Sequence, residues 1–544
     1  MNKKHIAALA ALAFTAALLV ILTGSLTGRK SLLAQSPDAA AGSPAASITQ
    51  AEKQALSAPR QLRAVWIATA WNIDWPSSQG LSAAKQQQEF TAMLDEAKNV
   101  GMNAVIVQVR PNADSLYPSE YGPWSDVLTG RQGQSPGYDP LAFMVEEAHK
   151  RNLEFHAWFN PYRIGKTKDA AKLAADHPAL RHPDWVAAYA GTQYYNPGIP
   201  EVRDFVVAGI TEVVRKYDID AVHLDDYFYP YPEKGKDFPD DFAYQKYGKS
   251  EFGSKPNWRR DNVNRLVEAI HAAIKKEKPY VKFGISPFGV WRNQNADPTG
   301  SETTAGTTNY DTLFADTRAW INAGWVDYIA PQLYWNFGFK PAAYDKLAEW
   351  WIKETEGKPV QLYIGHAPFK IGQQDPPGWQ NPDELPDQLK FNARSAGKIS
   401  GSILFSLKDI RRNPLGFRDR LNTELYASPA LVPPMPWLGS AAPQPPKALS
   451  AENTADGVRL DWRDGGGNPA YYAVYRAEGS GSEAPRLIGT VRSGGSGSQT
   501  FTDRAAPAGK PLRYVVTALD RLHNESTTSR TASADVPGRF AKTK

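Results

Sequence analysis

The chain of 544 residues contains no cysteine. It can therefore form no disulfide bond, and it has no thiol for the attachment of a lipid. The formal net charge is only +5, and the first 35 residues hold four basic side chains and no acidic one. Because the rest of the chain is nearly neutral, we expect no nucleic-acid partner.

Several motifs that bind phosphate, metal or an acyl group are also missing. No glycine-rich phosphate turn follows the first predicted strand, and no G-x-S-x-G motif occurs outside the Gly/Ser loops of the C-terminal region. His156, His223 and His366 are far apart in the sequence and have no cysteine partners. We therefore predict neither a metal site nor a cofactor.

The N-terminus, residues 1–35, has a short basic start followed by an apolar run from Ile6 to Leu22. This pattern is typical of a signal peptide, and an uncleaved N-terminal anchor is the alternative. Residues 36–58 are rich in Ala, Ser and Pro and are interpreted as a tether. We expect an exported protein of the cell envelope, periplasm or extracellular space, with membrane contact only through this N-terminal segment.

Eight apolar runs, most of them preceded by a helical stretch, predict a (β/α)₈ TIM-type barrel of the α/β class over residues 59–426. A doubly wound sheet is the alternative, but the missing phosphate turn disfavours it. The predicted strands cover residues 63–71, 103–111, 153–163, 219–230, 281–291, 326–335, 360–369 and 401–409.

A proline-rich linker, residues 427–445, separates the predicted barrel from a C-terminal region with a different pattern. Over residues 446–537, short alternating strands are divided by turn signals, which predicts an all-β sandwich. This region resembles a fibronectin type III domain, in which Trp462, Tyr472 and Tyr514 would be core aromatics. We interpret this C-terminal region as a spacer and not as a second binding domain.

Polar and aromatic side chains gather where the predicted barrel strands end. Loops are polar in general, but TIM barrels carry their chemistry at these strand ends. Apolar ring faces together with bidentate hydrogen-bonding groups suit sugars, so we predict a polysaccharide partner. The predicted substrate-binding residues are Trp71, Asp74, Trp75, Gln108, Arg110, Asn160, Tyr162, Arg163, His223, Tyr227, Trp291, Gln332, Tyr334 and Trp335.

Six successive segments together resemble the family-10-like glycosyl hydrolases of bacteria: RAVWIATAWNIDWP, QVRPNADSLYPS, WFNPYR, DAVHLDDYFYP, FGISPFGVW and APQLYW. The resemblance spans roughly residues 60–426. It implies an exported (β/α)₈ enzyme that cuts bacterial glycan, and one branch of the family is associated with peptidoglycan strands stripped of their peptides. This chain departs from many members because it lacks a lipoprotein cysteine and carries the C-terminal sandwich.

The predicted catalytic residues are Asp225, Asp226 and Asp114. In a two-carboxylate scheme, Asp225 would pair with Asp114. Alternatively, the adjacent aspartates resemble those of O-GlcNAcase-type hexosaminidases. In that case Asp225 would orient the sugar's acetamido group, Asp226 would be the acid/base, and Tyr334 would help hold the amide.

Two other interpretations of the aspartate doublet remain open. The doublet could form structural ion pairs with Arg110 and Arg163, or the barrel could bind cell-wall glycan without cutting it.

Overall fold

The computed structural model describes residues 56–439, 441–479, 483–495 and 497–537. The expected signal peptide or anchor and most of the expected tether lie outside these residues. Within the described part of the chain, no helix is both long and apolar enough to cross a membrane.

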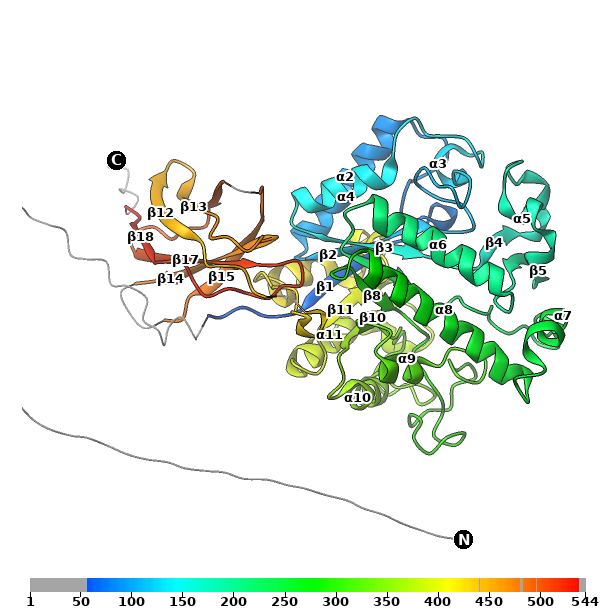
Figure 1. The fold of residues 1–544 in the computed structure, drawn as a ribbon. Helices are drawn as coiled ribbons and strands as arrows, with labels where there is room; N and C mark the ends of the chain where they lie inside the picture. The colour runs from blue at the N-terminus through cyan, green and yellow to red at the C-terminus, as the bar shows by residue number, and fades with distance from the viewer. Residues whose placement is uncertain (1–55, 440, 480–482, 496, 538–544) are drawn as a thin grey trace, which may run out of the picture. The chain divides into compact units, whose positions relative to one another are not determined.

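Eight parallel strands close into a barrel, which confirms the predicted α/β fold class (Figure 1). Around the barrel the order is β1-β11-β10-β9-β8-β7-β3-β2, and the pairing of Leu62 in β1 with Gly401 in β11 closes it. The strands are β1 (Leu62–Ile67), β2 (Ala104–Arg110), β3 (Glu154–Phe159), β7 (Ala221–Leu224), β8 (Lys282–Ile285), β9 (Tyr328–Ile329), β10 (Gln361–His366) and β11 (Gly401–Leu404).

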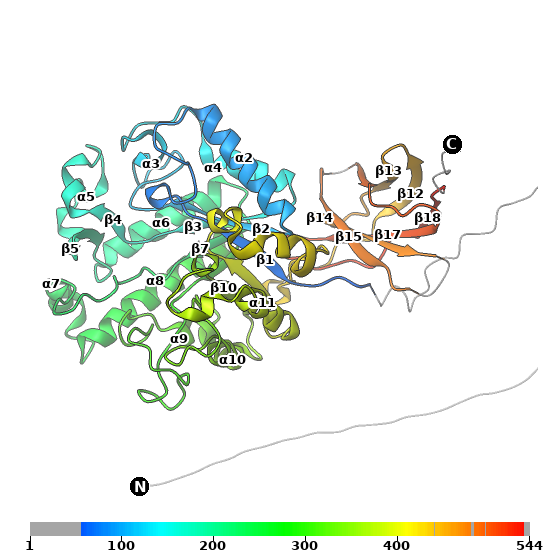
Figure 2. The same ribbon diagram turned by 180° about the vertical axis from the view of Figure 1, so that it is seen from behind.

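Helices surround the strands, as Figures 1 and 2 show. They are amphipathic: α2, for example, buries Phe90, Met93, Leu94 and Ala97 at helical spacing, and Ser82 caps its N-terminus. The principal helices are α2 (Ala83–Asn99), α4 (Pro140–Lys150), α6 (Pro200–Lys216), α8 (Lys255–Glu277), α9 (Thr317–Ala323), α10 (Tyr344–Thr355), α11 (Glu384–Arg394), α12 (Leu407–Arg411) and α13 (Phe417–Arg420).

Long insertions follow β2, β3, β7 and β8 at the C-terminal ends of these strands. The loop after β2 holds the short helix α3 (Asp126–Thr129). The segment after β3 holds a small antiparallel sheet in the order β4-β6-β5, which comprises β4 (Arg163–Lys166), β5 (Val186–Tyr189) and β6 (Thr192–Tyr195). The insertions after β2 and β3 supply walls for the cavities described below.

The C-terminal region folds into two antiparallel sheets, β12-β13-β16 and β15-β14-β17-β18. Trp462, Tyr472 and Tyr514 are buried in their common core, which agrees with the predicted sandwich. The strands are β12 (Lys447–Thr454), β13 (Gly457–Arg463), β14 (Tyr471–Glu478), β15 (Arg486–Arg492), β16 (Ser498–Asp503), β17 (Pro511–Leu519) and β18 (Ala532–Asp535).

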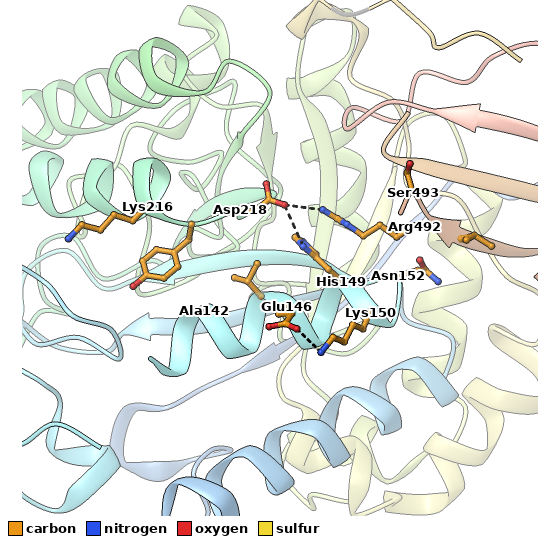
Figure 3. A pocket seen from close by; sticks show the side chains of 12 residues that line it. Ala142, Glu146, His149, Lys150, Asn152, Lys216, Asp218, Arg492 and Ser493 are labelled. Carbon is orange, nitrogen blue, oxygen red and sulfur yellow. Dashed lines mark hydrogen bonds and ion pairs between the residues drawn. The ribbon is translucent and has the colours of Figure 1, made fainter. Parts of the chain in front are cut away.

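A hollow of about 630 Å³ lies near the N-terminal ends of β3 and β7, between α4, the end of α6 and β15 (Figure 3). Its charged groups already have partners: Asp218 contacts His149 at 3.7 Å and Arg492 at 3.2 Å, and Lys150 pairs with Glu146 at 2.7 Å. Because the hollow lies near the N-terminal ends of the strands, it is at the end of the barrel opposite the polar strand ends. Its ion pairs are typical of a structural contact.

Candidate active site

A cavity of about 330 Å³ opens at the C-terminal ends of the barrel strands. Strand β7 ends at Leu224, so Asp225 and Asp226 come directly after it and are no longer bound to the alternating faces of a strand. Both carboxylates line this one cavity. The other lining residues are Trp66, Ala68, Ala70, Trp71, Ile73, Gln108, Trp158, Arg163, Tyr227, Tyr231, Ser286, Gln332, Tyr334, Phe369 and Phe405.

Asp225 is held by three N–H donors. Its Oδ2 accepts from the indole of Trp158 at 3.1 Å and from the Asn160 amide at 3.3 Å. Its Oδ1 accepts from the backbone N–H of Tyr227 at 3.0 Å. These donors fix the carboxylate in orientation and leave Oδ1 able to accept one more hydrogen bond.

Asp226 has a different set of partners. Its Oδ1 accepts from the Gln332 amide at 3.0 Å, and its Oδ2 accepts from the hydroxyl of Tyr231. Gln332 is itself fixed, because the same amide nitrogen donates to the backbone oxygen of Ser286 at 2.8 Å. Residues on three different segments therefore place Asp226 against Asp225.

Burial raises the pKa of both carboxyl groups, because removal from solvent disfavours the charged form. The charge of Asp226 adds to the effect of burial and brings the pKa of Asp225 to about 7. Two carboxylates this close titrate as a pair, so the pair retains one proton near neutral pH. A shared proton of this kind is what general acid catalysis requires.

His223 lies beneath the cavity. Its Nε2 is 3.2 Å from the indole nitrogen of Trp66 and 3.0 Å from the hydroxyl of Ser286, and its Nδ1 is 2.9 Å from the hydroxyl of Tyr328. Burial lowers the pKa of His223 well below its usual value, so the ring is neutral. It supports residues that line the cavity and does not line it itself.

Trp71 and Arg163 lie at the opening of the cavity. The indole of Trp71 is 58% exposed, and the Arg163 guanidinium lies 4.8 Å from its ring centre. Arg163 donates to the backbone oxygen of Pro111 and to Asn112, while Arg110 donates to the backbone oxygen of Tyr121. Among the described residues, neither arginine forms an ion pair with Asp225 or Asp226, so the geometry does not favour the structural ion-pair interpretation.

Asp114 does not line this cavity. It lines a second hollow of about 450 Å³, which shares Trp71 with the first. Asp225 and Asp226 are the only carboxylates among the described residues that line the first cavity. A direct catalytic pairing of Asp225 with Asp114 therefore has no geometric support.

Of the predicted substrate-binding residues, six line the first cavity: Trp71, Gln108, Arg163, Tyr227, Gln332 and Tyr334. Asn160 touches the site through Asp225. The side chains that the structure places elsewhere are Asp74, Trp75, Arg110, Tyr162, Trp291 and Trp335.

Packing explains where these other side chains lie. Asp74 accepts from the backbone N–H groups of Ala68 and Lys408, each at 2.8 Å, and so ties the end of β1 to the segment after β11. Trp75 is fully buried, and Trp291 stacks on Trp350. Direct sugar contact by these residues stays a prediction without geometric support.

Nine residues that line the cavity are absent from the predicted site residues. Two of them, Ile73 and Tyr231, lie outside the predicted strands and carry no local signal. The other seven lie within the predicted strands, where alternation along the strand could have indicated the inward-facing side chains: Trp66, Ala68, Ala70, Trp158, Ser286, Phe369 and Phe405.

Among the described residues, no group of three or more histidine and carboxylate side chains is placed to hold a metal ion. The arrangement instead combines two carboxylates, amide and hydroxyl donors and aromatic walls. It can hold a sugar ring and transfer a proton to or from it.

Comparisons with known proteins agree with this chemistry. The chain is 57% identical to glycosyl hydrolase YngK of Bacillus subtilis, over 87% of this chain and 93% of that protein. It is 42% identical to glycosyl hydrolase DigH of Escherichia coli, over 68% of this chain and 88% of that protein. The model of the family "Glycosyl hydrolase-like 10" matches residues 61–381, more than half of the chain, and the protein therefore belongs to this glycosidase family.

Proposed function

We propose that this protein is an exported glycosidase that cuts the sugar chains of the bacterial cell wall, with peptide-free peptidoglycan strands as its substrate. The observation that carries the proposal is the pair Asp225 and Asp226 in one aromatic-walled cavity. The signal-like N-terminus supports export, since wall glycan lies outside the cytoplasm.

The absence of a further carboxylate among the cavity's described lining residues bears on the mechanism. Ordinary glycosidases place one carboxylate on each side of the sugar, at least about 5 Å apart. Two neighbouring side chains extend from one strand end and cannot flank a ring in this way. We therefore assign the nucleophile to the substrate, as the oxygen of its own 2-acetamido group.

In this scheme the acetamido oxygen attacks the anomeric carbon while the glycosidic C–O bond breaks. Asp226 gives its proton to the leaving oxygen. Asp225 accepts a hydrogen bond from the acetamido N–H at its open Oδ1, and the Tyr334 hydroxyl donates to the acetamido oxygen. Water then adds to the anomeric carbon as the bond to the acetamido oxygen breaks, and the proton of the water goes to Asp226, which regenerates the acid.

The test is product analysis by mass spectrometry, with a count of new reducing ends, on purified peptide-free glycan strands. Asp225→Asn and Asp226→Asn should each lower turnover by about 10²- to 10⁴-fold, because each removes a group that acts in the transition state. Asp204→Asn, on the exposed face of α6, is the matched control and should leave turnover unchanged.

Two outcomes would contradict the proposal. Retention of the strands in a pulldown without any release of reducing ends would make the barrel a binding protein. Equal cutting of N-acetylated and N-deacetylated strands would rule out the acetamido group as nucleophile and leave only the broader glycosidase assignment.

A further inference from the structure

A hydrogen-bond relay of three buried side chains, His223, Tyr328 and His156, crosses the inside of the barrel below the catalytic cavity. The Tyr328 hydroxyl lies 2.9 Å from His223 Nδ1 and 3.0 Å from His156 Nδ1. Tyr328 belongs to β9, which pairs with neither β7 nor β3, the strands of the two histidines. The contacts therefore run through the barrel interior.

Each end of the relay meets a group that can act in one way only. At the cavity end, the indole N–H of Trp66 lies 3.2 Å from His223 Nε2, and an indole can only donate. At the other end, Oε2 of Glu154 lies 3.0 Å from His156 Nε2, and an ionised carboxylate can only accept. The relay thus runs from a fixed donor to a fixed acceptor.

Glu154 keeps its negative charge although it is buried. Burial alone would raise the pKa of this carboxyl group, but Lys282, His523 and a hydrogen bond from His156 hold its pKa well below the usual value. Lys282 is itself buried in the barrel strand β8 and pairs with Glu154. The barrel therefore supplies a countercharge of its own, and the acceptor at this end does not depend on the C-terminal sandwich.

These two ends permit one order of the hydrogen atoms between them. His223 Nε2 accepts from Trp66, so the neutral ring carries its hydrogen on Nδ1 and donates it to the Tyr328 hydroxyl. Tyr328 then donates its own hydrogen to His156 Nδ1, and His156 donates from Nε2 to Glu154. Every donor of the relay finds an acceptor only in this order.

This order decides what Ser286 offers to the catalytic cavity, which it lines. Its hydroxyl lies 3.0 Å from His223 Nε2 and 3.4 Å from the backbone oxygen of Leu224, and neither of these two atoms carries a hydrogen. The single hydroxyl hydrogen of Ser286 therefore points into the protein, whichever atom accepts it. A ligand in the cavity meets the lone pairs of the Ser286 oxygen and no hydrogen.

We propose that Ser286 is a specificity-determining residue, which accepts a hydrogen bond from an O–H group of the sugar held at Asp226. His223 and Tyr328 are positioning residues, because the relay keeps the Ser286 oxygen in this acceptor state. The Gln332 amide nitrogen lies 2.8 Å from the backbone oxygen of Ser286 and 3.0 Å from Asp226, which places Ser286 beside the acid. The inference rests on the proposed function, which supplies the sugar.

The first measurement needs no substrate. Nitrogen NMR of the full chain with isotope-labelled histidine reports which ring nitrogen carries the hydrogen, and each signal is assigned by replacing one histidine. His223 should carry its hydrogen on Nδ1 and His156 on Nε2. In Tyr328→Phe, part of the His223 population should move its hydrogen to Nε2. Hydrogen on Nε2 of His223 in the wild type would overturn the proposal.

The second measurement is a double-mutant cycle of kcat/KM on peptide-free glycan strands. Ser286→Ala should lower kcat/KM about tenfold and Tyr328→Phe about fivefold, as expected when one hydrogen bond to the substrate is lost or weakened. Because Tyr328 acts through Ser286, adding Tyr328→Phe to Ser286→Ala should cause no further loss. Two additive losses would overturn the positioning role.

Tyr363→Phe is the matched control for Tyr328→Phe. The ring of Tyr363 lies 5.1 Å from that of Tyr328 in the same buried cluster, and its hydroxyl takes no part in the relay. The control should leave kcat/KM unchanged. Equal losses in Tyr363→Phe and Tyr328→Phe would assign the effect to packing and refute the role of the Tyr328 hydroxyl.

Turnover by the wild-type chain separates this inference from the proposed function. If the wild type retains the strands but releases no reducing ends, the proposed hydrolysis is refuted, and the same cycle measured on affinity for the strands decides the role of Ser286. If Ser286→Ala cuts the strands as well as the wild type does, the hydrolysis stands and the role of Ser286 is overturned.

Discussion

At the scale of single residues, Asp225 and Asp226 differ in what their partners can do with a proton. All three donors to Asp225 are N–H groups, which cannot accept a proton, so the negative charge is stabilised there. Asp226 contacts the hydroxyl of Tyr231, which can donate or accept. The Tyr231 hydroxyl can therefore reorient as Asp226 gains or loses a proton, which suits the residue to which the proposal gives the acid's role.

Tyr231→Phe tests this arrangement. Burial is the main cause that raises the pKa of Asp226, and the hydrogen bond from Tyr231 opposes it. A general acid must be protonated, so kcat/KM should fall as pH rises through the upper pKa of the pair, near 7. Without the hydroxyl, Asp226 should keep its proton up to a higher pH. The fall in kcat/KM should therefore move to higher pH, and kcat should drop.

The measurement is a pH profile of kcat/KM on short glycan oligosaccharides. Tyr138→Phe is the control, because its hydroxyl binds Gln86 at 3.0 Å away from the cavity. An alkaline limb at the same pH in Tyr231→Phe and the wild type would show that this hydroxyl does not tune the acid.

At the scale of elements, the apolar runs located all eight barrel strands but not their ends. The run 326–335 contains only the two-residue strand Tyr328–Ile329, and the run 153–163 contains a strand that ends at Phe159. Apolar residues such as Leu333 continue to pack into the core after the ladder of hydrogen bonds has ended. Hydrophobicity reports burial, and it does not report which backbone groups find a partner.

The same limit applies to the candidate site. The position of the doublet after the fourth strand was enough to predict Asp225 and Asp226 as a site. The direction of Trp75 or Trp291 depends on packing with distant segments, so residue type alone could not show that both belong to the core. Tyr231 comes back to Asp226 only because the loop after β7 turns, and no periodic pattern marks that turn.

Gly284 in β8 allows a prediction about the barrel as an element. A Cβ atom at this position would lie 2.0 Å from the ring of Tyr328 in the neighbouring strand. Gly284→Ala should therefore destabilise the barrel by about 1–3 kcal/mol or more, because the core is closely packed. Thermal unfolding should show a lower Tm than in Gly306→Ala, where the added Cβ meets nothing within 4 Å. Equal Tm values for Gly284→Ala and Gly306→Ala would mean that the barrel interior can rearrange to accommodate the added Cβ at residue 284.

At the scale of the whole molecule, catalysis and the C-terminal sandwich are separate in the sequence. Every residue that lines the two cavities lies between Trp66 and Phe405. The sandwich contacts the starts of two barrel strands: His523 Nε2 lies 2.6 Å from Glu154, and Arg521 lies 3.1 Å from Asp220. These contacts are at the end of the barrel opposite Asp225, so they bear on stability and not on chemistry.

A chain that stops at residue 445 should therefore keep its kcat/KM on short soluble oligosaccharides and unfold at a lower temperature. Glu154 and Asp220 are nearly fully buried, and each loses a partner when the sandwich is removed. Kinetics and thermal unfolding of the two chains provide the measurement. A truncated chain that is folded but inactive would show that the sandwich takes part in turnover.

The exposed indole of Trp71 also gives the molecule an optical signal of its own. Of the 16 tryptophans, only Trp71 and Trp437 are exposed, at 58% and 36%. Trp71 alone of these two borders both hollows. A sugar chain that spans the two would displace water from this ring, so occupancy can be followed as a blue shift of the intrinsic fluorescence, without a label and without waiting for a bond to break.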